Sequence, residues 1–527
     1  MRSVRTLPGV LASIQPGPHP EFEFFNLGVW QILHISKSPF RSMFACQQEQ
    51  CSAMWKENEA ILKVILSIEK FKGDYSLFCN AVLQNGYSPD YKNFSRLLLW
   101  KTCLITESLN IKTWKERLQS SRAVYHELSR APSMKIPWWL LKADSEYFTA
   151  LPVPEKDHVP RTLRRPTRIQ NPTSDPLINE PAEQMASNKY FDVELDAELL
   201  RVIILDVQRL FPGDSQFHGA DKDCLAHRRR IISILFVWSK CNVDVGYKQG
   251  IHEILGLIYK NLWSESVNIS NTNTLSFEDL EILSLYDVKY LEHDLFCILN
   301  KFVANSGVMG QFYQSETALR GAIKKFNGYL MKVDQLLHYN LITKLRLDTE
   351  LWSIRFFRLL LLRELGNDLA IQSSFWDKLV AAEAFSSPSH QAIPELLYFS
   401  IIILLINVKA DLALCDFAEA MLLLLHYPIS SRLHLHPNFV DLLFQDAYRL
   451  WTYRHTDLKL YEYGIKLNER YASVIRVSFG AESQSIAKGI RLNTIPSTCE
   501  IKRENSAFEK SRMENRLKKR VQLFLKN

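Results

Sequence analysis

The stretch LLRVIILDVQRLF, residues 199–211, decides the fold of this chain together with a second stretch about forty residues later. Its apolar residues recur at the three- and four-residue spacing of a helix. Ile203, Asp206 and Arg209 step along this helix at i, i+3 and i+6, so Asp206 falls at the edge of the apolar stripe and Arg209 well away from it. Because Pro212 then ends the pattern, we expect Arg209 in the last helical turn.

The second stretch, DVGYKQGIHEILGLIYKNL at residues 244–262, predicts a glycine-flanked turn that opens another amphipathic helix. Gln249 lies near the start of that helix and between Gly246 and Gly250, where the backbone can approach a partner closely. Each feature alone has an ordinary explanation. A terminal arginine complements the helix dipole, Asp206 and Arg209 could form a surface ion pair, and Gln249 could be a turn residue.

Taken together and in this order, the residues resemble the two signatures of the TBC domain, the catalytic module of GTPase-activating proteins for Rab GTPases. The signature I-x-x-D-x-x-R is matched by Ile203, Asp206 and Arg209, and Y-x-Q-G by Tyr247, Gln249 and Gly250. The resemblance implies an arginine finger at Arg209 and a glutamine finger at Gln249, both inserted into the active site of the GTPase. It also implies that Asp206 orients the arginine, while the loop that carries the glutamine is shaped by Gly246, Tyr247 and Gly250.

Further matches follow in the order expected for this domain. They are R-x-x-x-W at residues 96–100, a helix over 111–128 with Arg117 and Arg122 exposed, Y-L-E-H-D at 290–294, and W-x-x-R-x-x-R-L-L-L at 352–361 followed by F-W-D. The resemblance implies an all-α, two-lobed TBC domain over residues 91–450. The motif Y-K-Q-G-x-H-E, with Lys248 and Ile251 where cysteine and methionine are commoner, is similar to one subgroup. That subgroup includes a retromer-associated endosomal member and a yeast Golgi/endosome member directed at Ypt GTPases.

Three acidic or imidazole side chains in Y-L-E-H-D raise the question of a metal site. Adjacent residues on a helix point about 100° apart, so Glu292, His293 and Asp294 cannot converge on one ion. We expect a cluster that caps a helix N-terminus instead.

The flanking regions differ in composition from the domain. Residues 1–90 form an N-terminal extension of unknown role that includes a short amphipathic helix over 58–71. Nine prolines between Pro132 and Pro181 predict an extended or partly disordered insertion at 131–188, within which four arginines form a basic cluster. Residues 451–527 form a helical region and a basic tail, and 502–527 could lie on an anionic membrane, bind a partner or remain solvated.

Composition excludes several classes of protein. The formal net charge is +7, and nine Lys/Arg against three Glu at 502–527 account for +6 of it, so the rest of the chain does not resemble a nucleic-acid-binding protein. The nine cysteines form no C-x-x-C pair, which indicates neither zinc nor a disulfide framework and favours a reducing, cytoplasmic compartment. The apolar runs 396–408 and 421–425 are too short to cross a membrane and predict buried helices.

These observations leave two main hypotheses. The first is a GTPase-activating protein for a Rab or Ypt GTPase, located peripherally at Golgi or endosome membranes. It would have no cofactor of its own, because the sequence contains no phosphate-binding glycine motif, and GTP and Mg²⁺ would belong to the partner. The alternative is a catalytically silent TBC scaffold or tether that binds a Rab or a retromer-like endosomal coat complex. A helical adaptor without a link to GTPases fits the ordered matches less well.

Overall fold

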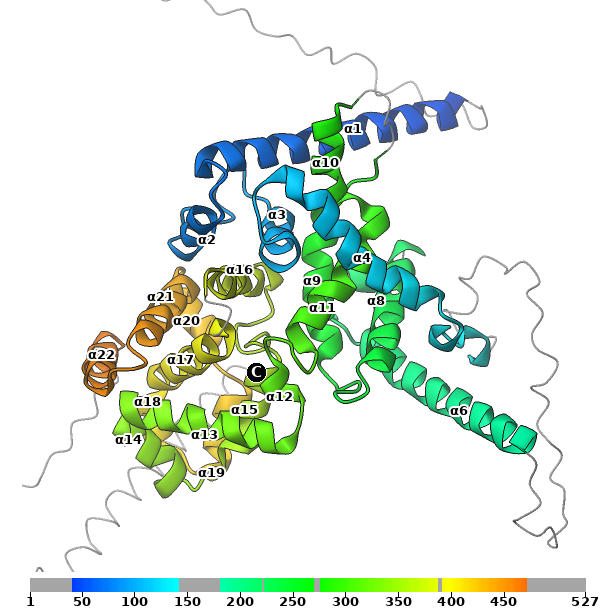
Figure 1. Ribbon diagram of the computed structural model, residues 1–527. Coiled ribbons are helices and arrows are strands. Elements are labelled where there is room, and N and C mark those ends of the chain that lie inside the picture. Colours follow the sequence, from blue (N-terminus) through cyan, green and yellow to red (C-terminus); the bar gives the residue numbers. More distant parts are fainter. Residues whose placement is uncertain (1–39, 142–180, 220–221, 270–274, 387–390, 472–527) are drawn as a thin grey trace, which may run out of the picture. The chain divides into compact units, whose positions relative to one another are not determined.

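The computed structural model describes residues 40–141, 181–219, 222–269, 275–386 and 391–471 (Figure 1). Within these ranges the chain is helical, and the one β-type pairing is an isolated bridge between Val267 and Asp287. The predicted all-α class is therefore confirmed. The chain divides into two units, residues 1–54 and 55–527. In the first unit, the described part is the beginning of α1 (Phe40–Phe71).

A first group of helices in the second unit packs around α9 (Ile251–Glu265). It comprises α3 (Arg96–Lys101), α4 (Trp114–Arg130), α6 (Pro181–Gln208), α7 (Ser215–His218), α8 (Lys222–Cys241), α10 (Phe277–Tyr286) and α11 (Leu291–Val303). Helix α9 contacts α3, α6, α8 and α11 and is buried around most of its circumference. The expected single apolar face is wrong for this helix, because neighbours cover it on several sides.

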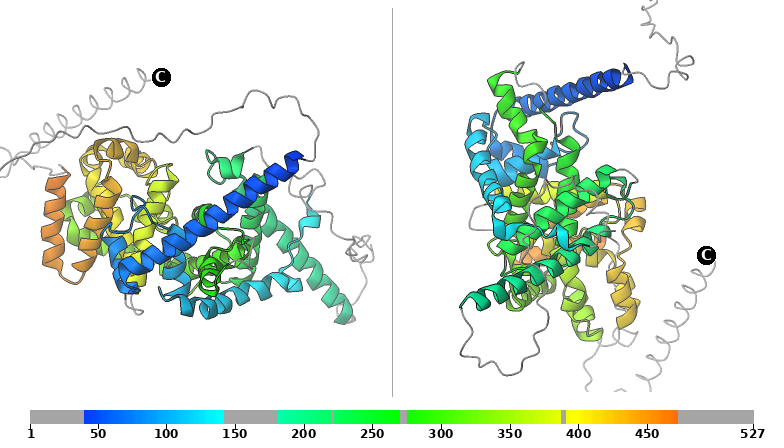
Figure 2. Two further views of the ribbon diagram at one scale, coloured as in Figure 1. Left: turned by 90° about the horizontal axis from the view of Figure 1, so that it is seen from above. Right: turned by 90° about the vertical axis from the view of Figure 1, so that its right-hand side faces the viewer.

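A second group of helices packs around α17 (Ala392–Asn407). It comprises α12 (Gly310–Tyr313), α13 (Glu316–Val333), α14 (Gln335–His338), α15 (Thr349–Arg358), α16 (Leu369–Phe385), α18 (Lys409–Leu414), α19 (Phe417–Leu425), α20 (Ile429–Leu435), α21 (Phe439–Thr452) and α22 (Asp457–Arg470). Figure 2 shows this group, in yellow-green to orange, beside the first group, in cyan to green. Helix α16 joins the groups by contacting α3, α9 and α2 (Tyr75–Leu83). The predicted two-lobed organisation is confirmed.

Two clusters of charged side chains tie distant segments together. Asp294 of α11 accepts hydrogen bonds from Lys101 Nζ at 2.7 Å and from Arg122 Nε at 2.7 Å, and all three residues are buried. Asp377 of α16 accepts from Arg96 Nε at 2.8 Å and from the Trp100 indole at 2.7 Å. The sequence motifs R-x-x-x-W and F-W-D, far apart in the chain, therefore meet through one carboxylate.

Some boundaries predicted from the sequence differ from the structure. The helix expected at 58–71 is the second half of α1. The expected insertion at 131–188 contains short 3-10 turns at Pro132–Met134 and Trp138–Leu140, and its last residues already belong to α6. Its basic cluster and the tail at 502–527 lie outside the described residues.

The two longest apolar runs differ in how deeply they are buried. Residues 396–408 are buried in and just after α17, as predicted. Residues 421–425 belong to α19, where Leu422 is 62% exposed, so the prediction of a fully buried helix is wrong there. None of the helices in the described ranges combines the length and apolar character that crossing a membrane requires.

Candidate functional site

Arg209 directly follows α6 and lies at the protein surface. The apolar stripe of this helix is buried, including Ile203, which is fully inaccessible to solvent. The helix ends at Gln208, so Arg209 follows the last helical turn in which it was predicted to lie, and Phe211 adopts a positive φ of 43° before Pro212. The Arg209 backbone N–H still donates to Asp206 O at 3.2 Å in a closing turn. This ending releases the Arg209 side chain from the packed face of α6.

Asp206 is a buried carboxylate that holds the exposed Arg209 guanidinium. The Asp206 side chain is 5% exposed and that of Arg209 is 58% exposed. One carboxylate oxygen accepts a hydrogen bond from Arg209, and the other accepts one from the Tyr247 hydroxyl at 2.8 Å. A buried carboxylate is retained only where its oxygens are paired, and here both are. The arrangement anchors one side of the guanidinium while the side chain remains exposed.

Gln249 lies in the turn between α8 and α9, two residues after Tyr247. Gly246 has φ +63° and Gly250 has φ +104°, both in the region that favours glycine. A Cβ at Gly250 would approach Leu359 Cδ2 to 2.7 Å, so the turn is packed closely against the segment after α15. Gln249 is exposed, and its amide has no hydrogen-bond partner within the described part of the chain. The turn thus presents an unengaged amide at the surface.

The Tyr247 hydroxyl links the turn that carries Gln249 to the end of α6, next to Arg209. It donates to Asp206 and also lies 3.2 Å from Nδ1 of His252. Burial, reinforced by the Asp206 charge, raises the pKa of Tyr247, so the hydroxyl keeps the proton that it donates. The structure therefore brings together five of the seven residues singled out in the sequence, namely Asp206, Arg209, Tyr247, Gln249 and Gly250. Ile203 anchors α6 in the core, and Gly246 shapes the turn.

Lys248, the departure from the commoner motif, is half-buried and supports the turn from within. Its Nζ donates to Val245 O at 2.7 Å and to Tyr313 O at 2.6 Å. Burial and the nearby Arg358 charge lower the pKa of Lys248. The lysine side chain connects the turn to α12, which a cysteine would be too short to do.

Three neighbours of the site were not identified as site residues in the sequence. His252 and Glu253, in the first turn of α9, are buried, and Glu253 accepts hydrogen bonds from Arg363, whose Nε lies 3.0 Å from Oε2. The hydrogen bond with Glu253 raises the pKa of Arg363. For His252 and Glu253, the available signal was two consecutive polar residues at the start of α9, directly before a mainly apolar run at residues 254–259.

The Y-L-E-H-D segment is structural, but not as predicted. Glu292 and Asp294 lie in the first turn of α11, at the helix N-terminus as predicted, but the N-cap residue is Tyr290 and it makes no side-chain cap, so the predicted capping role is wrong. Asp294 instead binds Lys101 and Arg122, and Arg122, predicted to be exposed, is 7% exposed. Glu292 accepts from the Tyr125 hydroxyl at 3.4 Å. Within the described ranges, no three His, Cys, Asp or Glu side chains are grouped as metal ligands.

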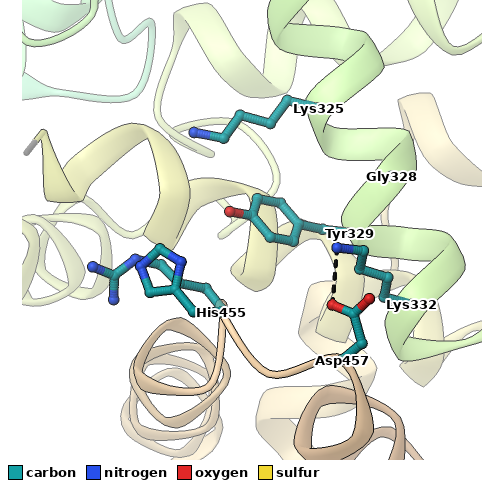
Figure 3. A pocket seen from close by; sticks show the side chains of 7 residues that line it. Lys325, Gly328, Tyr329, Lys332, His455 and Asp457 are labelled. Atoms are coloured by element: carbon teal, nitrogen blue, oxygen red, sulfur yellow. Dashed lines mark ion pairs between the residues drawn. The ribbon is translucent and has the colours of Figure 1, made fainter.

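Three hollows in the described part of the chain lie away from Arg209 and Gln249. One of about 480 Å³ is lined by Lys325, Gly328, Tyr329, Lys332, Arg454, His455 and Asp457 (Figure 3). Its charges are largely compensated, because Lys332 pairs with Asp457 at 2.9 Å and Lys325 pairs with Glu395 at 2.6 Å. Two others, of about 450 and 440 Å³, lie along α4. None of these three hollows is lined by Arg209 or Gln249, whose side chains are exposed at the surface.

Comparison with known proteins gives the site a family context. Residues 164–412, which include both Arg209 and Gln249, match the Rab-GTPase-TBC domain. TBC1 domain family member 5 of Mus musculus is 23% identical over 287 residues, which cover 49% of this chain and 33% of that protein. TBC1 domain family member 5 homolog B of Dictyostelium discoideum is 31% identical over 139 residues, covering 26% of this chain and 12% of that protein.

A solved structure is also similar to this chain. It is the crystal structure of the Ypt/Rab-GAP domain of Gyp1p, with a TM-score of 0.48 and 14% identity over 75% of this chain and 99% of that one. The matched region spans about a third or less of the length of the curated relatives.

Proposed function

Since residues 164–412 of this chain belong to the Rab-GTPase-TBC family, we propose that the protein is a GTPase-activating protein for a Rab or Ypt GTPase. In this proposal Arg209 and Gln249 enter the nucleotide site of the partner. The GTP and Mg²⁺ belong to the GTPase, and the protein needs no cofactor of its own.

The observation that carries the proposal is the exposure of two polar side chains on segments that are hydrogen-bonded to each other. Arg209 and Gln249 are both exposed, and their segments are joined by the hydrogen bond between Asp206 and Tyr247. A catalytic group donated to another protein has to reach out of its own surface and still be held in place. Asp206 meets the second requirement for Arg209, and the close packing of Gly250 against Leu359 meets it for the turn that carries Gln249.

The chemistry of phosphoryl transfer matches these two side chains. In the transition state of GTP hydrolysis, negative charge spreads over the transferred phosphoryl group and onto the leaving oxygen. A guanidinium carries a permanent charge and several planar donors, so Arg209 can stabilise that charge. An arginine supplied in trans is typically worth about 10³–10⁵ in rate. The Gln249 amide has both a donor and an acceptor and can therefore orient the attacking water.

The cellular setting belongs to the same proposal. A Rab-directed activator would act in vesicle trafficking, at the cytoplasmic face of Golgi or endosome membranes. The similarity of Y-K-Q-G-x-H-E to an endosomal and Golgi subgroup supports this setting, as do relatives named TBC1 domain family member 5. Retromer-like coat components are candidate further partners, and residues 502–527 are a candidate membrane contact.

A screen of purified Rab GTPases tests the proposal. We expect the full chain to accelerate single-turnover GTP hydrolysis by at least one Rab, by about 10³-fold or more at saturation. Failure to accelerate any Rab in a complete panel would reject the activator function. If a GTP-bound Rab still bound tightly, the scaffold hypothesis would replace it.

A further inference from the structure

His252 lies at the point where the Arg209 and Gln249 segments meet. It is in the first turn of α9 and only 1% exposed. Its Nδ1 lies 3.3 Å from the Gly250 backbone N, 3.2 Å from the Tyr247 hydroxyl oxygen and 3.5 Å from a carboxylate oxygen of Asp206. One imidazole nitrogen therefore faces the turn that presents Gln249 and the carboxylate that holds Arg209.

The hydrogen-bonding partners determine which form of the imidazole fits. The backbone N–H of Gly250 can only donate, so Nδ1 has to accept and carries no proton. The ring proton then resides on Nε2, which lies 3.9 Å from an oxygen of Glu253. Burial lowers the pKa of His252, which favours the same neutral form.

We propose that neutral His252 is a positioning residue that holds the Gln249 turn in register with the Asp206–Arg209 pair. The inference rests on the proposed function for its effect on catalysis, whereas its structural part does not. The imidazole acts on the two finger residues through Gly250, Tyr247 and Asp206, and need not touch the GTPase.

Protonation of His252 would disrupt this arrangement. The titratable groups that face the imidazole are Asp206 on α6, Arg209 just after it, the neutral Tyr247 in the turn, Glu253 on α9, and Arg363 after α15. A proton on Nδ1 removes the acceptor for Gly250 N–H. It also offers Asp206 a second cation, which competes with Arg209 for the carboxylate. We therefore expect stimulated hydrolysis to fall on the acidic side of neutrality.

Two substitutions separate an acceptor role from simple packing. His252→Asn keeps an acceptor near the position of Nδ1 but does not titrate, whereas His252→Leu keeps much of the volume and removes the acceptor. His227→Leu is a matched control, because His227 is 7% exposed and its Nδ1 contacts the Tyr259 hydroxyl at 2.6 Å, away from both finger residues.

Hydrogen exchange in the full chain tests directly whether His252 stabilises the turn that carries Gln249. In peptides spanning residues 245–252, we expect His252→Leu to accelerate exchange at least about tenfold. His252→Asn should restore most of the protection, and His227→Leu should leave this segment unchanged. Unchanged exchange in His252→Leu would overturn the proposal, whether or not the protein activates a Rab.

Kinetic measurements with a responsive Rab test whether His252 affects the stimulated rate of GTP hydrolysis. We expect His252→Leu to lower the stimulated kcat by about tenfold to a hundredfold with little change in KM. We expect His252→Asn to recover most of the rate and to lose the acidic fall. A wild-type kcat in His252→Leu, or equal damage by both substitutions, would overturn the proposal. If the wild-type chain activates no Rab, the proposed function fails, while hydrogen exchange still decides the positioning role.

Discussion

Arg209 and Asp206 differ from an ordinary surface ion pair on the same helix. Arg201 and Glu198 have the same i, i+3 spacing, but both side chains are more than 60% exposed, so their pairing is worth only about 0.5 kcal/mol or less. In the Arg209 pair the carboxylate is buried and also bound by Tyr247. That difference favours a functional arginine over the helix-dipole and surface ion-pair explanations.

Replacing Asp206 tests whether this carboxylate orients the arginine. Asp206→Asn keeps the shape but removes the charge, so we expect stimulated GTP hydrolysis to fall about tenfold to a hundredfold. Circular dichroism should remain that of a helical protein. Glu198→Gln is the matched control on the exposed pair and should retain the full rate. Equal rates in both variants would remove Asp206 from the account.

Gly250 is expected to be sensitive to any side chain. Gly250→Ala combines a strained positive φ with an approach to Leu359, so we expect a loss of about 2–4 kcal/mol in unfolding free energy. Gly328→Ala is the matched control, because its Cβ would meet open space within α13, and we expect a gain of up to about 1 kcal/mol. Urea denaturation measures both, and a neutral Gly250→Ala would show that the turn is adaptable.

For single residues, the sequence predicted which side chains are exposed better than it predicted which side chains contact one another. The helical pattern indicated that Arg209 points away from the core, and the glycines indicated a special turn around Gln249. The role of His252 depends on contacts with Tyr247, Gly250 and Asp206, and the last of these lies on another helix. No local pattern encodes such a contact, so the sequence could not identify it.

At the scale of the helix, the periodicity of apolar residues predicted where helices form better than it predicted which of their residues are buried by neighbouring helices. Arg122 shares a stripe with Leu118 and Tyr125 at i, i+4 and i+7, which could have indicated burial on α4. It was nevertheless expected to be exposed. Its partner, Asp294, lies on α11, and nothing in the sequence of α4 specifies that pairing. For α9, the apolar residues were recognised, but its burial on several sides follows from the packing of α3, α6, α8, α11 and α16 against it.

The buried Asp294 is expected to be a large contributor to stability. Asp294→Ala would leave Lys101 and Arg122 buried without their counter-charge, so we expect a loss of about 3–5 kcal/mol. Glu316→Ala, which removes a 72% exposed partner of Arg320, should cost less than about 1 kcal/mol. Chemical denaturation measures the difference, and a cost for Asp294→Ala below that of Glu316→Ala would contradict the assignment.

The same carboxylate predicts a pH dependence of stability. Burial alone would raise the pKa of Asp294, but the charges of Lys101 and Arg122 lower it below its usual value. A carboxyl with a lowered folded-state pKa stabilises the protein above its unfolded pKa of about 4, and this contribution is lost as the pH falls through the folded value. We expect Asp294→Asn to flatten this acidic limb in unfolding measured against pH. If Asp294→Asn leaves the acidic fall in unfolding free energy unchanged, that fall arises from other carboxyl groups.

At the scale of the whole molecule, the resemblance predicted the order of the motifs and the two-lobed helical fold. It did not predict that the motifs R-x-x-x-W and F-W-D are joined by Asp377, because nothing local to either motif specifies the other. Arg209 and Gln249 are exposed at the surface, and in the proposed function they complete the active site of a partner GTPase. The proposed activity therefore has to be measured as GTP hydrolysis by a second protein.

Single-turnover GTP hydrolysis by a responsive Rab tests the central claim most directly, with the full chain as wild type, Arg209→Ala, Gln249→Ala and the exposed-arginine control Arg201→Ala. We predict that Arg209→Ala loses at least about a hundredfold of the stimulated rate, while Arg201→Ala retains it. On a Rab whose own water-positioning glutamine has been replaced, we predict a comparable loss for Gln249→Ala. Wild-type stimulation by Arg209→Ala, or by Gln249→Ala on that Rab, would contradict the assignment of the two fingers.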